Sequence, residues 1–215
     1  MRWVNAGDKL ATYRDRYYAQ CCFILLVNSG LRIGELREMR WKDISIEEGE
    51  DDKGNEGEYT FGWVPKGKTG AREVTFQPGV EVFFRRLQLF RTAERRGLFP
   101  DLDDPSPDKN ELILCHPDGR SIRSFKHSFK SLLSFAGVDV ERDGKPRTLY
   151  SFRHYYATQG IRENLNPVSL AKQMGTSVDM IERHYAQVMP REAAALITRR
   201  KPSKIGFRKD IVLKF

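Results

Sequence analysis

The first third of the chain contains one long apolar segment followed by several short ones. Residues 15–30 are apolar on almost every side and end at Gly30, which predicts a buried helix that stops at the glycine. The next residues, LRIGELREMRW, place Ile33, Leu36 and Arg40 at helical spacing and predict a second helix directly afterwards. Three β-rich runs then predict a small antiparallel sheet with a lysine-bearing hairpin at KGKTGA: DISI, YTFGWVP and REVTF.

The rest of the chain is mostly helical in its pattern. Residues 78–97 carry one apolar face between Pro78 and Gly97 and predict a long structural helix. Four or five further helices are expected between residues 121 and 198. Turn-forming residues should separate them, near 137–147 and at Pro167, Gly175 and Pro190. The whole pattern predicts an α+β fold, mostly helical with a small antiparallel sheet.

Length and composition indicate one globular unit in a reducing compartment. The chain has 215 residues, enough for one substantial core, and its longest apolar run, Cys21 to Val27, is too short to cross a bilayer. Three cysteines cannot form a disulfide framework, and no signal-peptide pattern opens the chain, so we expect a cytoplasmic protein. The cysteines and histidines lack paired ligand spacing, so we expect no metal site.

Charge is distributed unevenly. The net charge is +8, and residues 199–215 contain seven Lys or Arg and one Asp, so six of the eight net positive charges lie in this tail. Acidic residues gather at 47–58 and 100–108, which we interpret as solvated surface, the first as an exposed loop. A basic chain with segregated acidic stretches indicates a polyanionic partner.

Tyr185, within MIERHYAQV, is either an aromatic residue of the core or the residue that carries out the chemistry. A tyrosine hydroxyl attacks phosphorus only where neighbouring cations favour the phenolate and neutralise the charge on the phosphate. Without a metal, those cations would be Arg and Lys, with Arg preferred for its bidentate grip on phosphate oxygens. Taken alone, Tyr185 does not decide between the two interpretations.

Four separated segments carry such residues in order: SGLRIGELREMRWKDI, PKGKTGAREVTF, LYSFRHYYAT and LAKQMGTSVDMIERHYAQV. Together they resemble the sequence boxes of the tyrosine recombinases, the phage-integrase family, over nearly all of the chain from Tyr13 to Met189. The resemblance implies that Arg32 and Arg153 clamp a phosphate, that Glu35 supports Arg32, that Lys68 is the general acid and that Tyr185 is the nucleophile. The fold it implies is the DNA breaking-rejoining fold of the family's catalytic domain.

Two positions depart from the family pattern. Tyr150 stands where the second box usually has histidine, and Thr176 stands where the closing box usually has histidine or tryptophan. Neither is a competent base at neutral pH, but both hydroxyls can donate a hydrogen bond to phosphate. The base that accepts the Tyr185 proton is therefore left open. His154 and His184 are supporting candidates, and a satisfied structural role is the alternative for both.

Structural interpretations also exist for the other candidates. Arg32 could form a surface ion pair with Glu35, Lys68 could be a solvated turn residue, and Arg153 could form a structural ion pair. The order and spacing of all four boxes favour the catalytic interpretation.

The resemblance implies metal-independent cleavage and rejoining of double-stranded DNA through a 3′-phosphotyrosyl intermediate, without a cofactor. The family acts as a homotetramer on two duplexes, and we expect a monomer in free solution. Residues 1–198 would form the catalytic domain without the family's N-terminal core-binding domain. Residues 199–215 would be a basic tail that docks on a neighbouring protomer, with docking on its own domain or simple disorder as the alternative. A non-catalytic DNA-binding remnant, a type IB topoisomerase and, more remotely, a metal-dependent nuclease are the competing functions.

Overall fold

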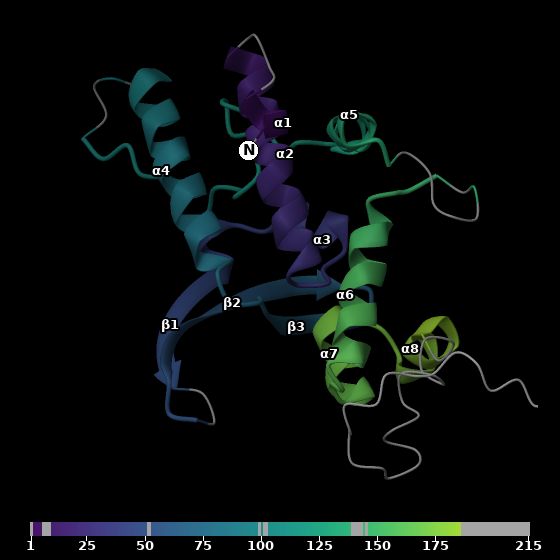
Figure 1. Ribbon diagram of the computed structural model, residues 1–215. Helices are drawn as coiled ribbons and strands as arrows, with labels where there is room; N and C mark the ends of the chain where they lie inside the picture. Colours follow the sequence, from purple (N-terminus) through teal and green to yellow (C-terminus); the bar gives the residue numbers. More distant parts are fainter. Residues whose placement is uncertain are drawn as a thin grey trace, which may run out of the picture.

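Helices pack against a small sheet in the computed structural model, which describes residues 2–5, 10–50, 53–98, 100, 103–138, 144 and 146–185 (Figure 1). In chain order the described helices and strands are α1 (Arg2–Asn5), α2 (Leu10–Val27), α3 (Ile33–Glu38), the 3₁₀ turn η1 (Trp41–Asp43), β1 (Ile44–Glu50), β2 (Glu56–Gly67), β3 (Gly70–Thr75), α4 (Glu81–Leu98), α5 (Lys126–Ala136), α6 (Tyr150–Arg162), α7 (Pro167–Met174) and α8 (Val178–Tyr185). The predicted α+β fold is confirmed.

Helix α2 forms the centre of the core. It lies between α4 and α6 and also contacts α1, α3 and α5 (Figure 1). Tyr18, Cys22 and Leu25 on this helix are fully buried, as the nearly all-round apolar pattern predicted. Complete burial of a side chain such as Leu25 contributes about 1.5–3 kcal/mol, so this helix anchors the elements around it. None of the helices in the described part of the chain is long and apolar enough to cross a bilayer.

The second predicted helix is shorter than expected. Helix α3 ends at Glu38, and the backbone of Met39 is extended, so Arg40 does not continue the helical face as predicted. The carbonyl oxygen of Met39 accepts a hydrogen bond from the Ile113 amide, and Arg40 forms a bridge with Leu112. These long-range backbone bonds replace the next helical turn.

The sheet is antiparallel, in the order β1-β2-β3, with a bulge between Val64 and Gly67 of β2. The acidic stretch 47–58 was expected to be an exposed loop, and this prediction is wrong: β1 continues to Glu50 and β2 begins at Glu56. Glu48 lies opposite Glu58, so like charges face each other across the strands. Arg85 from α4 offsets part of this repulsion through its ion pair with Glu58.

A second apolar cluster joins α6, α7 and α8. Asn166 caps α7 at Pro167, and Gly175 ends α7 in the left-handed conformation, so these two predicted breaks are confirmed. The expected helices after Tyr185, the break at Pro190 and the basic tail 199–215 lie outside the described residues.

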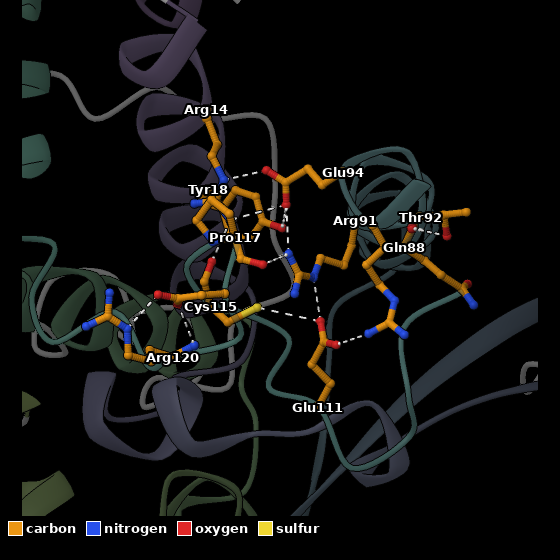
Figure 2. A network of polar contacts seen from close by, with 12 residues as sticks. Arg14, Tyr18, Gln88, Arg91, Thr92, Glu94, Glu111, Cys115, Pro117 and Arg120 are labelled. Carbon is orange, nitrogen blue, oxygen red and sulfur yellow. Dashed lines mark hydrogen bonds and ion pairs between the residues drawn. The ribbon is translucent and has the colours of Figure 1, made fainter. Parts of the chain in front are cut away.

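A network of buried charges links α2 to α4 (Figure 2). Arg91 donates to Glu111 at 2.5 Å and to Glu94 at 3.2 Å, and Arg14 from α2 forms an ion pair with Glu94. The Arg91 side chain is 4% exposed. The sequence predicted α4 as structural from its apolar face but gave no sign that Arg91 is buried in ion pairs.

Candidate active site

Arg32 and Glu35 form the first part of the site at the start of α3. Gly30 adopts a φ of +67° and turns the chain between α2 and α3. Glu35 Oε2 then accepts a hydrogen bond from the Arg32 amide at 3.0 Å, and Arg32 Nη1 donates to Glu35 Oε1 at 2.9 Å. Glu35 thus accepts one backbone and one side-chain hydrogen bond from Arg32, which fixes both side chains at the N-terminus of α3.

Arg72 on β3 makes a second ion pair with Glu35. Its Nη1 and Nη2 donate to the two carboxylate oxygens at 3.0 and 2.8 Å. Burial, the largest influence, would raise the pKa of Glu35, but hydrogen bonds from Arg72 and Arg32 outweigh it and lower the pKa. Glu35 is therefore an anion that holds two arginines.

The turn between α7 and α8 supplies the next contact. Gly175 has a φ of +64°, and its carbonyl oxygen accepts a hydrogen bond of 2.5 Å from Arg32 Nη2. Thr176 follows directly and is half-buried, and its amide donates to the Ala171 carbonyl. Thr176 thus lies one residue from a group that Arg32 contacts.

Arg153 reaches the same region from α6. It is buried, and its Nη1 donates to the Gly30 carbonyl at 2.5 Å. Burial lowers the pKa of Arg153 below its usual value, and the positive charge of Arg32 lowers it further. Two guanidinium groups are therefore close enough to repel each other, an arrangement typical of a site that receives an anion.

Tyr150 lies one helical turn before Arg153 and is half exposed. A hydrogen bond between Tyr150 and Arg153 opposes the fall in the pKa of Arg153. The Tyr150 ring also meets the ring of His154 edge-on, with centroids 4.7 Å apart. The structure thus brings Tyr150 and His154 beside the buried arginine.

Lys68 lies in the exposed turn between β2 and β3. The neighbouring Gly67 packs against the ion pair: a β-carbon there would lie 2.6 Å from Arg72 Nη1 and 3.3 Å from Glu35 Oε1. The backbone of the turn therefore runs directly beside the arginine cluster. Lys66, at the end of β2, is exposed as well.

Tyr185 is the last residue of α8, and α8 contacts α6 and α7 (Figure 1). The side chains of His184 and Tyr185 lie outside what the structure describes. The expected roles of His184 and Tyr185 stay predictions. The structure shows where the helix that carries these two residues lies.

The centre contains more positive than negative charge. Arg32, Arg72 and Arg153 converge on Glu35, and all three interact with this one carboxylate. Across the described ranges, no group of three or more His, Cys, Asp or Glu side chains is arranged to hold a metal ion. An anion such as a phosphate is the ligand that this excess of guanidinium groups favours.

Sequence reasoning missed Arg72. A signal was present, because β-strand side chains alternate between faces and Val74, two residues later, is buried. Arg72 therefore had to point inward and needed an anionic partner.

Comparison with known proteins finds tyrosine recombinases that are similar to this chain in sequence or fold. No protein-family model matches the sequence. A protein described as tyrosine recombinase XerC-like, from Caldanaerobacter subterraneus subsp. tengcongensis, is 24% identical over 190 residues, a match that covers 79% of this chain and 46% of the relative. The XerH site-specific recombinase bound to its difH substrate is similar in structure, with a TM-score of 0.62 and 16% identity over 93% of this chain and 50% of that chain.

The chain has the fold of the tyrosine recombinase catalytic domain. The Tn1549 transposon integrase in complex with transposon right end DNA shares the fold of this chain, with a TM-score of 0.57 and 21% identity over 92% of this chain and 62% of that one. The λ integrase dimer bound to a core site gives a TM-score of 0.53 at 16% identity, over 91% of this chain and 61% of that chain. The chain spans about half the length of the curated relative it matches.

Proposed function

We propose that this chain is a tyrosine recombinase and carries the DNA-cleaving and rejoining centre of a site-specific recombinase. The observation that supports the proposal most strongly is the convergence of Arg32 and Arg153. Arg153 bonds the Gly30 carbonyl across 123 residues of sequence, two residues before Arg32, and the charges of the two arginines influence each other. Folding therefore concentrates two phosphate-binding groups on one spot.

The arginines would bind the non-bridging oxygens of a DNA phosphate. A guanidinium has five N–H donors, so Arg32 can keep its bonds to Glu35 and Gly175 and still donate to a phosphate oxygen. The hydroxyls of Tyr150 and Thr176 would add hydrogen bonds as charge builds on the phosphate. Pre-aligned donors of this kind stabilise the transition state without a metal.

The chemistry is a transesterification. The Tyr185 phenol gives its proton to the base that the sequence leaves open and its oxygen attacks phosphorus, so that a P–O(Tyr) bond forms and the bond from phosphorus to the 5′ oxygen breaks. Lys68 transfers a proton to the departing 5′ oxygen, which leaves as a hydroxyl. A 5′ hydroxyl of a partner duplex then attacks the phosphotyrosyl link and reverses the step, so no cofactor or ATP is consumed.

The partner would be double-stranded DNA, bound by four protomers on two duplexes during strand exchange. The structures of XerH, the Tn1549 integrase and λ integrase contain DNA, which supports this choice of substrate. The basic tail 199–215 would dock on a neighbouring protomer and contact phosphate. Deletion of Arg199 to Phe215 should then abolish assembly on paired sites, and unchanged assembly would contradict this role of the tail.

A nicked suicide substrate tests the proposal. Cleavage next to the nick releases a short 5′-hydroxyl fragment that diffuses away, so the covalent protein–DNA complex accumulates and can be counted on a denaturing gel. We expect this complex to form in EDTA. Its absence would favour the non-catalytic remnant, and metal-dependent cleavage without a covalent complex would favour a nuclease.

A plasmid without a target site separates recombinase from topoisomerase. A type IB topoisomerase relaxes supercoils without a specific sequence or a second duplex. We expect no relaxation of such a plasmid, and efficient relaxation would overturn the assignment as a recombinase.

A further inference from the structure

Arg72, which lies in the second of the four sequence boxes, links three elements of the fold. Its guanidinium bonds both oxygens of Glu35 on α3. It also donates to the carbonyl oxygens of Gln173 at 3.2 Å and Met174 at 3.3 Å, at the end of α7. One side chain on β3 therefore holds a strand, the first arginine box and the segment that precedes Thr176 together.

The backbone of the hairpin explains why such a link is needed. Val64 pairs with Arg72 and Gly67 pairs with Gly70, but Pro65 and Lys66 interrupt the regular ladder between them. A proline has no N–H to donate to the ladder, so the regular pairing of β2 with β3 cannot continue through Pro65. The turn that carries Lys68 is thus attached to the sheet beyond an irregular stretch.

Arg72 lies at the last regular pair before this irregularity. Its side chain is 10% exposed, and that of Glu35 is 6% exposed, so the ion pair is largely shielded from water. A bidentate pair fixes both distance and orientation, which a single hydrogen bond does not. β3 is therefore clamped to Glu35 only a few residues from Lys68.

We propose that Arg72 is a positioning residue that holds the β2–β3 hairpin, and with it Lys68, over the arginine pair during DNA cleavage. This role rests on the proposed function. Arg72 holds the fold rather than the reacting phosphate, because its four hydrogen bonds use four of its five N–H donors on Glu35 and the α7 carbonyls. Loss of Arg72 should therefore impair proton donation to the leaving 5′ oxygen more than it impairs DNA binding.

The leaving group provides a direct test. A suicide substrate with a bridging 5′ sulfur at the scissile phosphate releases a thiolate, which needs no proton because a thiol has a pKa of about 8.5, whereas an alkoxide is a far stronger base. Variants that lack the general acid, or hold it out of place, should cleave the sulfur substrate at close to the wild-type rate. Variants that damage the phosphate clamp should stay slow on both substrates.

Full-length protein should be compared on the oxygen and sulfur substrates at saturating DNA. We expect Arg72→Gln to bind DNA like the wild type. On the oxygen substrate it should form the covalent complex about 100-fold more slowly, because displacement of a catalytic group by about 1 Å reduces rates by this factor. On the sulfur substrate its rate should lie within about threefold of the wild-type rate. Lys68→Ala should show the same pattern. Arg153→Lys should be slow on both.

Two further variants complete the test. Arg85→Gln removes another arginine–glutamate pair, the exposed pair between Arg85 of α4 and Glu58 of the same sheet, and should behave like the wild type on both substrates. Arg72→Lys keeps the charge but loses the bidentate geometry, so it should give an intermediate rate on oxygen. This milder variant also decides the matter if Arg72→Gln does not fold, as judged by circular dichroism.

The outcomes are distinct. An equal defect of Arg72→Gln and Arg72→Lys on oxygen and sulfur would overturn the hairpin role and assign Arg72 to the clamp. Wild-type rates of both variants on the oxygen substrate would show that Arg72 does not position the hairpin. Wild-type protein that forms no covalent complex with either substrate would overturn the proposed function and this role with it.

Discussion

Arg32 donates a hydrogen bond of 2.5 Å from its Nη2 atom to the carbonyl oxygen of Gly175. This bond joins the start of α3 to the turn that ends α7, 143 residues later in the sequence. The next residue after Gly175 is Thr176, so the bond fixes the distance between the first arginine box and the closing box.

Gly175 should therefore be sensitive to substitution. A β-carbon at Gly175 would lie 2.6 Å from Arg72 Cζ, and the bonded Arg72 guanidinium could move only by breaking its contacts with Glu35. We expect Gly175→Ala to destabilise the protein by about 3 kcal/mol in urea unfolding, from the left-handed backbone and the clash together.

Gly137 provides the matched control. It also ends a helix in the left-handed conformation, with a φ of +65°, but no atom lies within 4 Å of its β-carbon position. Gly137→Ala should lose only about 1 kcal/mol for the backbone conformation. Equal losses at the two glycines would contradict the packing of Arg72 against Gly175.

The Glu35 ion pairs should make stability depend on pH. The pKa of Glu35 is lowered from its ordinary value of 4.5, so the unfolded chain binds this proton more readily than the folded protein does. The stabilisation by Glu35 is thus complete above about pH 5 and is lost as the pH falls through the folded-state pKa. We expect Glu35→Gln to be about 3 kcal/mol less stable than wild type at pH 7.

Urea unfolding of both proteins from pH 7 to pH 3 measures this effect. The difference between wild type and Glu35→Gln should shrink below pH 4.5, because the protonated carboxyl resembles the neutral amide. A difference that stays constant over this range would show that the charge of Glu35 does not stabilise the fold.

Local sequence signals predicted where several of the helices end. Gly30, Pro167 and Gly175 mark chain reversals because their backbone preferences act without help from distant residues. The early end of α3 was not predictable in this way, because the competing hydrogen bond from Ile113 comes from a distant segment.

The same limit applies to the site. The boxes indicated Arg32, Glu35 and Arg153, but the partners of Glu35 and Arg153 are Arg72 and the Gly30 carbonyl, which only folding brings near. Glu47 to Glu58 misled the prediction because a run of acidic residues resembles a loop, whereas the pairing of β1 with β2 continues through it. Long-range pairing thus overrode composition in both cases.

The buried network around Arg91 should stabilise the contact between α2 and α4. Arg91→Met would leave Glu94 and Glu111 each with one partner fewer in a site shielded from water. We expect a loss of about 3 kcal/mol in urea unfolding. Arg85→Met, which removes an ion pair with a side chain 51% exposed, is the control and should change the unfolding midpoint only slightly. Equal stability of the two variants would contradict a structural role for the network.

Tyr150 and Thr176 should act as hydrogen-bond donors to the phosphate rather than as bases. We expect Tyr150→Phe and Thr176→Val each to slow covalent-complex formation about 10-fold, the usual loss for one hydrogen bond to a charged group, with little change in DNA affinity. Removal of a donor should also leave the shape of the pH–rate profile unchanged. Loss of an ionisation from that profile in either variant would show that the hydroxyl titrates and takes part in proton transfer.

Identification of the amino acid that becomes linked to DNA tests the central claim most directly. The covalent complex should be trapped on the nicked substrate, digested with protease and nuclease, and mapped by mass spectrometry among the eight tyrosines of the chain. We predict a phosphodiester on Tyr185 alone, and no complex with Tyr185→Phe although that variant still binds DNA. A complex that persists in Tyr185→Phe, or a modified peptide that contains another tyrosine, would contradict the account.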